Sequence, residues 1–446
     1  LLYGYLNKKS GQLAGLLGAL IFISLPTILR TATTAYVDAG LVFFTTLSVL
    51  ASLYWRDSEY KKIGWLLISA VAMGLALGTK YSALPAWLFL TLAIVFVYSK
   101  DTGGQGRALR HGLVFFLVSL LVFSPWLIKN IILTGNPLYP LYQGVFGAGG
   151  GNLSEAYQIV STDAGMFKMR QMLYGDNFLE TLLIPIRFFL QGQDHNPQYF
   201  DGVLNPVLIF IVPFAFMNRK MKTDKILLLA SAVFFILLAF FMDKHRIRYI
   251  LPSVPLVIIL TVMGYVNILN WIMERPNRLR MAGLVAFAGA LIGMIGFNAA
   301  YAKNYFIKIA PVNYILQKES RDDFIARHDG SYRAVQFINK QTPANSRIRL
   351  ILLAGRGYYL DRSYDDDASF GMNVIQRMVS LSADEQEFQK YLRSLSCTHF
   401  LMRYDLFQKF LTDNYLPEEI NQLMAQLNKS VTMIYRDDYY AVIGLK

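Results

Sequence analysis

Nine long apolar stretches run through the first two thirds of the chain, separated by shorter polar segments. None of the nine contains an Asp, Glu, Lys or Arg residue, and each is about 17 to 25 residues long. A stretch of this length and composition can cross the hydrocarbon core of a bilayer as an α-helix. The nine stretches are residues 11–29, 39–55, 63–79, 81–99, 111–128, 202–218, 226–242, 249–273 and 281–302. The pattern therefore predicts a polytopic α-helical membrane protein.

Basic residues are concentrated in every second polar segment between these stretches. Loops rich in Lys and Arg stay on the cytoplasmic side of a membrane, so the alternation also predicts how the spans are oriented. The basic segments lie at residues 8–9, 56–62, 100–110, 219–225 and 275–280. The remaining segments, including a long loop over residues 129–201, are expected on the outer face.

The chain becomes polar after Ala302 and takes on the pattern of a water-soluble domain. Helical spacing covers residues 331–341 and 384–394, and strand-like patterns cover residues 347–354, 398–403, 431–435 and 440–445. Two further helices before a final hairpin would complete one small core. We therefore expect a transmembrane domain over residues 1–302 and an extracytoplasmic α/β domain over residues 303–446.

Composition agrees with this division. Apolar residues make up 54% of the chain and the mean hydropathy is +0.35, which is high for a soluble protein. The net charge of +13 would favour nucleic-acid binding in a soluble protein, but here the basic residues lie in loops that orient the spans. A single cysteine, Cys397, excludes internal disulfides and any cysteine-built metal site.

Metal and cofactor sites are not indicated by the sequence. Asp194 and His195 adjoin a turn in the long loop, yet the other histidines show no ligand spacing. We find no glycine-rich phosphate loop before a helix and no serine nucleophile elbow. We therefore predict no metal ion and no cofactor.

Two charged residues at the outer ends of predicted spans are candidates for function. Asp38 precedes an apolar helix, where it could be an N-terminal cap, a functional acid, or both. Lys80 lies at the break between two apolar spans with no acid beside it in the sequence. An anion would be its natural partner, although a lysine that reaches up to lipid headgroups would fit the same position.

A third corner, residues 244–255, carries several basic side chains on the face where the orientation rule does not expect them. Arg246 and Arg248 could bind a phosphate group through paired N–H donors. Binding of anionic lipid headgroups is the alternative interpretation.

Further candidate contacts come from polar and aromatic residues close to these corners. The segment over residues 124–142 ends a helix at prolines and presents tyrosines at the membrane surface, which alone would only anchor a helix exit. The candidates for substrate binding are Tyr81, Asn136, Tyr139 and Tyr249.

The order of several short motifs resembles a known group of membrane enzymes. The motifs are TTAYVDAGLVFF at 33–44, GLALGTKYSALP at 74–85, SPWLIKNIILTGNPLYP at 124–140, QYFDGVLNP at 198–206 and RYILPSVP at 248–255. Together they resemble the membrane core of GT-C superfamily glycosyltransferases, in the bacterial branch similar to protein mannosyltransferases and aminoarabinose (lipid A) transferases. The tail, with LILLAGRGYYLDRSY at 350–364, resembles the outer soluble domain of many bacterial members.

The resemblance implies an enzyme of the bacterial cytoplasmic membrane. It would move a sugar from a polyprenyl-phosphate-linked donor to a glycolipid, polysaccharide or protein acceptor on the outer face. Lys80, Arg246 and Arg248 would stabilise the donor phosphate, whose negative charge grows as it leaves. Asp38 would be an auxiliary acid that orients the acceptor or balances charge.

In that family the main catalytic acid lies in the first outer loop, which the resemblance would place before Leu1. We therefore expect the 446 residues to be an N-terminally truncated chain that is inactive alone. A membrane transporter or a noncatalytic lipid-binding membrane protein remains the alternative, although one-sided placement of the distinctive residues favours a transferase.

Overall fold

The computed structural model describes residues 1–146, 166–242, 244–366 and 369–446. Within these residues the chain forms two compact units, one over residues 1–146 and 166–305 and the other over residues 306–446. Each unit is considered by itself. The glycine-rich run at 147–151 in the long outer loop lies outside the described residues.

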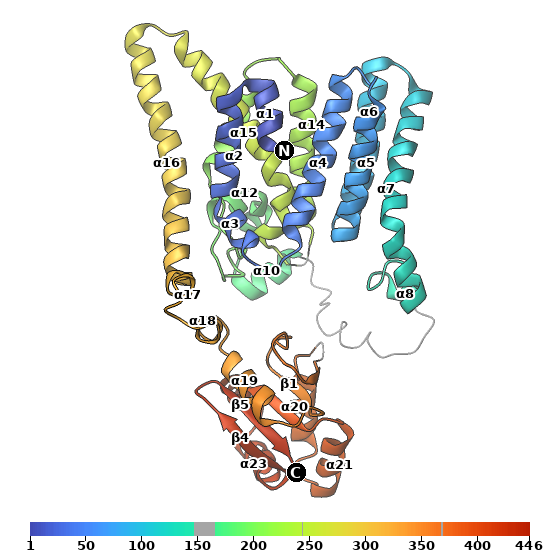
Figure 1. Cartoon of the computed structure of the whole chain (residues 1–446), viewed down its shortest axis with the longest axis vertical. Helices are drawn as coiled ribbons and strands as arrows, with labels where there is room; N and C mark the ends of the chain where they lie inside the picture. Colours follow the sequence, from blue (N-terminus) through green and yellow to red (C-terminus); the bar gives the residue numbers. More distant parts are fainter. Residues whose placement is uncertain (147–165, 243, 367–368) are drawn as a thin grey trace. The chain divides into compact units, whose positions relative to one another are not determined.

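The first unit is a bundle of apolar helices (Figure 1). Its longer helices are α1 (Leu2–Ser10), α2 (Gln12–Ser24), α3 (Pro26–Ala32), α4 (Asp38–Asp57), α5 (Ile63–Thr79), α6 (Ala83–Thr102), α7 (Gln105–Thr134), α14 (Lys222–Phe240), α15 (Val254–Met273) and α16 (Asn277–Ile309). Shorter elements are α8 (Gln143–Phe146), α10 (Met166–Tyr174), α11 (Phe178–Leu182), α12 (Ile184–Leu190), α13 (Val207–Ile211) and the 3₁₀ helices η1 (Val212–Phe216) and η2 (Ile247–Ser253).

Every predicted span contains helix, but the helices differ in length. Among the described residues, six helices are long and apolar enough to cross a membrane. The first predicted span is instead a bent pair, since α2 and α3 meet at 64°. Pro26 causes the break, because it has no N–H to continue the helical ladder and forces Leu25 into an extended conformation (φ −59°, ψ 132°).

Two predicted spans contain shorter helices. Helix α5 matches residues 63–79 but has 17 residues, and the stretch 202–218 holds only the short pair Val207–Phe216. The prediction of nine spans therefore keeps seven strong candidates, counting the bent pair as one, and two shorter ones within the described residues.

The basic turns of the first unit meet at one end of the bundle (Figure 1). The Lys9 ammonium lies 2.6 Å from an Asp57 oxygen and 3.1 Å from an Asp224 oxygen. Arg56 pairs with Asp224 and with Asp101, at 2.7 Å in both cases. These ion pairs join the ends of α1, α4, α6 and α14, as the alternating charge pattern requires.

Helix α15 forms the centre of this unit. Its side chains are buried without interruption from Val254 to Tyr265, because the helix is apolar on every side. Helices α1, α2, α4 and α14 pack around it. The η2 turn directly precedes α15, buries Ile247 and residues 250–253, and carries Arg248 at the N-terminal end of α15, whereas the basic turn 275–280 follows its C-terminal end.

Helix α16 is attached to the bundle more sparingly. Of its 33 residues, only Met294 and Asn298 are buried in the described structure. Asn205 donates hydrogen bonds to the Met294 carbonyl (3.0 Å) and to the Asn298 side chain (2.9 Å), and Asn298 donates to Ser24 (2.9 Å). A chain of polar groups thus holds α16 to α2 and to the start of α13.

Residues 178–190 of the long outer loop have few charges, a pattern that could form an amphipathic helix along the membrane surface. The segment instead forms α11 and α12, which are separated at Leu183 just before Pro185. Helix α12 buries Phe188 and Phe189, whereas Phe178, Leu179 and Ile186 stay exposed, so the position on the membrane surface stays a prediction.

The second unit contains a five-stranded mixed sheet, in the order β2-β1-β3-β5-β4. Its strands are β1 (Arg347–Ile351), β2 (Ser363–Asp365), β3 (His399–Arg403), β4 (Val431–Arg436) and β5 (Tyr440–Leu445). Strand β1 pairs in parallel with β2 and β3, whereas β5 pairs antiparallel with β3 and β4. Strands β1, β3, β4 and β5 agree with the predicted segments, whereas β2, three residues that are mostly exposed, was not predicted.

Helices cover the sheet on both faces. The helices that do so are α19 (Tyr332–Gln341), α20 (Met372–Ser380), α21 (Glu385–Ser394), α22 (Tyr404–Asn414) and α23 (Pro417–Ser430). The unit begins with two short helices that bury no residue, α17 (Val312–Ile315) and α18 (Arg321–His328). Helix α19 packs Val335 and Ile338 on Leu350 and Leu401 from the sheet. A second core gathers side chains of α20, α21, α22 and α23, with Phe388 fully buried.

Phe388→Ala tests this second core. Removing a fully buried phenylalanine should cost about 3 to 5 kcal/mol of unfolding free energy in this unit. Phe370, 44% exposed, is the matched control, and Phe370→Ala should change the unfolding free energy by less than about 0.5 kcal/mol. Pulse proteolysis of the full chain in detergent would measure both, and equal cleavage midpoints would contradict the assigned core.

Candidate functional site

Three helix ends meet at the end of the bundle opposite the basic turns. Helix α4 begins at Asp38, α5 ends at Thr79 just before Lys80, and η2 follows Arg246. Lys80 leaves the helix with an extended backbone (φ −160°, ψ 133°), which turns its side chain away from the α5 axis. Residues distant in the sequence therefore converge at one place.

Lys80 has a carboxylate partner that its sequence neighbours do not reveal. Its ammonium donates a hydrogen bond of 2.8 Å to Asp38 Oδ1. Asp38 is only 3% exposed, so its carboxylate is largely shielded from water. Lys80 thus has an anionic partner, as expected, but the partner is an acid of this chain from the start of α4.

The cap interpretation of Asp38 was wrong. Asp38 is the first residue of α4, after Val37, and its side chain makes no capping hydrogen bond to the described backbone. The carboxylate instead faces Lys80. Its place in the first turn still lets it interact favourably with the helix dipole.

Arg248 lies beside the same pair, held between aromatic rings. Its guanidinium is 4.5 Å from the ring centre of Tyr36 and 5.3 Å from that of Tyr249. The Lys80 ammonium lies 5.0 Å from the Tyr249 ring centre, so both cations share this tyrosine. The Arg248 Nε atom is buried and has no hydrogen-bond partner among the described residues.

Arg246 belongs to a neighbouring charge network. Its guanidinium lies 3.6 Å from Asp201 Oδ2, while Arg30 donates two hydrogen bonds of 3.0 Å to Asp201 Oδ1. Arg30 also pairs with Asp194 at 2.7 Å, and the hydroxyl of Tyr301 donates to the same carboxylate. Arg246 therefore already has a carboxylate partner, unlike Arg248.

The network depends on a tightly turned segment before the next helix. Phe200 and Asp201 have φ values of 69° and 41°, in the left-handed region that side chains rarely adopt. Burial opposes ionisation of Asp201, but Arg30 and the His195 amide N–H outweigh it and hold the pKa of that carboxyl below its ordinary value. Asp201 is thus a stable anion beside two arginines.

Tyr81 occupies a separate hydrogen-bonded hub. Its hydroxyl donates to the Tyr139 carbonyl (2.8 Å) and accepts from Trp126 Nε1 and Asn130 Nδ2, both at 2.9 Å. Asn136 donates to the Leu141 carbonyl at 2.7 Å. These contacts hold the turn after α7, so the predicted substrate contacts Tyr81, Asn136 and Tyr139 take part in local architecture.

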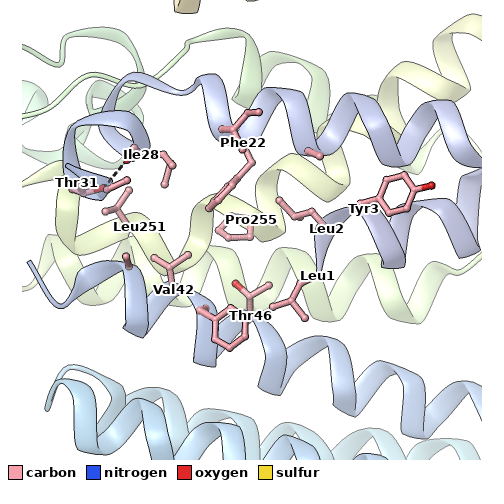
Figure 2. A pocket seen from close by; sticks show the side chains of 15 residues that line it. Leu1, Leu2, Tyr3, Phe22, Ile28, Thr31, Val42, Thr46, Leu251 and Pro255 are labelled. Atoms are coloured by element: carbon pink, nitrogen blue, oxygen red, sulfur yellow. Dashed lines mark hydrogen bonds between the residues drawn. The ribbon is translucent and has the colours of Figure 1, made fainter. Parts of the chain in front are cut away.

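The same bundle contains an apolar groove, which has no charged side chain in its lining (Figure 2). It has a volume of about 430 Å³ and lies between α2, α3, α4 and η2. Thr31 and Leu251 lie toward one end, and Leu2 and Tyr3 lie toward the other. Ala39, which also lines the groove, follows Asp38 directly in the chain. The buried hydroxyl of Thr46 is a polar exception in its wall, with no partner in the described structure.

Four of the eight predicted site residues lie together at the ends of α4, α5 and η2, namely Asp38, Lys80, Arg248 and Tyr249. Sequence reasoning missed Tyr36, Arg30 and Asp201, although the motifs at 33–44 and 198–206 contain two of them. It also missed the groove, since its wall consists of ordinary apolar residues. No cluster of three potential metal ligands occurs within the ranges that the structure describes.

Comparison with known proteins gives a family and a fold. Residues 2–254 match the family described as "Domain of unknown function (DUF8201)". No curated protein matches the chain by sequence. Two solved structures of ArnT from Cupriavidus metallidurans, one bound to undecaprenyl phosphate and one in the apo state, resemble it with TM-scores of 0.54 and 0.52.

The likeness to ArnT extends over 99% of this chain and 80% of that protein, at 14% and 15% sequence identity. Identity at this level establishes a similar fold and nothing finer. It supports the GT-C-like fold expected from the motifs, and with the apolar helices it indicates a multi-pass membrane protein.

A double-mutant cycle tests the Lys80–Asp38 pair. Asp38→Leu alone should cost about 2 to 3 kcal/mol of unfolding free energy, because it leaves a partly buried ammonium without its partner. The double variant Asp38→Leu with Lys80→Met should be less destabilised than the sum of the two single variants. Thermal unfolding in detergent would measure this, and strictly additive effects would mean that the pair does not form.

Proposed function

The chain belongs to the family described as "Domain of unknown function (DUF8201)", and we propose that it is an integral-membrane glycosyltransferase that uses a polyprenyl-phosphate-linked sugar donor. The sugar would pass to an acceptor on the outer face of the bacterial cytoplasmic membrane. The observation that carries this proposal is the apolar groove, whose wall includes Ala39, next to Asp38 in the chain, and Leu251, three positions after Arg248.

The arrangement suits a ligand with an apolar chain and a phosphate at one end. An isoprenoid chain would lie in the groove, which is walled by Phe22, Val42 and Phe43. Its phosphate would then lie close to the Arg248 guanidinium, whose Nε lacks a partner in the described part of the chain. One of the two ArnT structures is bound to undecaprenyl phosphate, and the similar fold supports the same class of carrier here.

The cations also suit the chemistry of transfer. When the sugar leaves, negative charge grows on the phosphate oxygens, and donors already in place stabilise that charge more than the ground state. Arg248 is oriented by Tyr36 and Tyr249, and Lys80 by Asp38, so neither must reorganise during the reaction. Arg246 would contribute less, because it belongs to the neighbouring network of Asp201 and Arg30 and not to the Lys80–Tyr249–Arg248 cluster.

The other residues take supporting roles in this proposal. Asp38 positions Lys80, and Tyr249 lies against both cations where it could contact the donor phosphate or sugar. The outer turn after α7 would be held in shape by Tyr81, Asn136 and Tyr139. These residues would affect substrate binding indirectly, through the position of the turn. The acceptor would be a glycolipid, a polysaccharide or a protein, with the extracytoplasmic α/β domain over residues 303–446 helping to choose it.

One observation favours a noncatalytic alternative. Asp38, Asp194 and Asp201, which lie at this end of the bundle, are each ion-paired with a lysine or arginine. A carboxylate held in this way is a poor general base, since its lone pairs are engaged by the cation. A protein that binds polyprenyl phosphate without transferring sugar, or that transports it, would need only the groove and the cations.

Loss of either cation should weaken binding of undecaprenyl phosphate. Lys80→Gln and Arg248→Gln should each raise the dissociation constant about ten- to a hundredfold, because a hydrogen bond to a charged group contributes about 1.5 to 3 kcal/mol. Lys61→Gln and Arg107→Gln, which change exposed residues at the other end of the bundle, are the matched controls. Titration of the four variants in nanodiscs with undecaprenyl phosphate would measure their dissociation constants. Equal constants in all four would mean that Lys80 and Arg248 do not bind the phosphate.

A turnover assay separates the enzyme from the binding protein. If the chain is a transferase, Lys80→Gln and Arg248→Gln should abolish sugar release from the polyprenyl-phosphate donor while the protein stays in the membrane at normal abundance. Tight binding of the carrier by the protein with no sugar release to any acceptor would favour the noncatalytic alternative.

A further inference from the structure

The chain that follows the last long helix exposes an unusual number of large apolar side chains. The exposed fractions are 51% for Phe306, 62% for Ile307, 44% for Val312, 40% for Tyr314, 68% for Ile315 and 57% for Leu316. They lie on the last turns of α16, on α17 and just after it. Six such residues within eleven positions form an apolar surface that water alone would not favour.

This surface belongs to a well-ordered segment. Arg327 donates hydrogen bonds to the Ile309 carbonyl (3.0 Å) and the Ala310 carbonyl (3.2 Å), which closes the C-terminal end of α16. The ring of Tyr314 stacks on Phe324 at 5.0 Å between centres. Helices α17 and α18 are therefore held against the end of α16, and the apolar side chains point outward because nothing in the described structure covers them.

Positive charges accompany the apolar surface. Lys303, Lys308 and Lys318 are exposed, and none of the three is ion-paired with a carboxylate of the described residues. Lys318 and Arg321 also line an open depression next to Tyr314. Apolar side chains beside unpaired lysines are typical of segments that lie in the interface of a membrane with anionic lipids.

The position of the segment in the chain indicates that the membrane covers this apolar surface. It follows directly on α16, one of the six described helices that are long and apolar enough to span a bilayer. The apolar part of α16 ends at Ala302, and the remaining turns up to Ile309 rise by only about 10 Å at 1.5 Å per residue. That distance corresponds to the headgroup region, where Tyr and Lys side chains commonly anchor a protein.

We propose that residues 306–318 are an interfacial anchor, in which the apolar side chains of α17 enter the bilayer surface and the flanking lysines contact anionic lipid headgroups. This inference does not depend on the proposed transferase activity. It assigns a lipid surface, rather than a protein partner, to the only cluster of this kind after α16 in the described residues of the second unit.

Spin labelling of the full chain in vesicles tests the proposal. The sequence has one cysteine, so Cys397→Ser gives a cysteine-free background. Ile315→Cys would place a label on the proposed anchor, and Leu416→Cys would place one on an equally exposed leucine elsewhere in the second unit (67% against 68%). Power saturation compares collisions with oxygen, which concentrates in lipid, and with a water-soluble nickel chelate.

The expected result is a severalfold larger oxygen-to-nickel ratio at position 315 than at position 416. Equal ratios at the two positions would overturn the proposal. Low accessibility to both reagents at position 315 would also overturn it, since the surface would then be covered by protein, from this chain or a second copy. Retention of the fold would be checked by comparing the label's lineshape at position 416 in chains with the native Ile315 and with a substituted residue at position 315.

A second arm tests the lysines. Lys308→Gln combined with Lys318→Gln should shift the label at position 315 toward water in vesicles containing phosphatidylglycerol and leave it unchanged in pure phosphatidylcholine. A shift of the same size in both lipids, or no shift in either, would refute contact between the lysines and anionic headgroups.

Discussion

The ion pair between Lys80 and Asp38 sets the arrangement of the outer site. It joins the end of α5 to the start of α4 and keeps an ammonium group beside Tyr249 and Arg248. Because Asp38 neutralises Lys80, the positive charge that remains without a carboxylate partner in the described structure is that of Arg248. The site therefore combines a lysine held in place by its ion pair with an arginine, Arg248, that has no carboxylate partner among the described residues and can bind an anion.

Charge pairing of a similar kind closes the other end of the bundle. There Asp224, 1% exposed, accepts from both Lys9 and Arg56. A buried carboxylate between two cations is costly to disturb, since removing either cation leaves charge uncompensated in a poorly solvated place. Ion pairs at both ends thus hold together helices whose apolar faces alone would pack with little directional preference.

Sequence patterns predicted the elements well and the site only in part. Residues 63–79 form α5 with the expected bounds, and the strands over 399–403 and 440–445 follow the predicted segments, because the apolar patterns there are local signals. The partner of Lys80 is 42 positions away, and no local pattern reports such a contact. The same holds for Arg246, which the sequence placed on phosphate and the structure places beside Asp201.

The sparse attachment of α16 has a consequence for how the membrane part is put together. In lipid there is little hydrophobic gain when helices associate, so hydrogen bonds and close packing decide which helices adhere. The amide chain from Asn205 through Asn298 to Ser24 supplies such bonds at one level of the helix. Helix α16 can therefore insert as an independent segment and join the preassembled bundle later, with a few amide groups selecting its register.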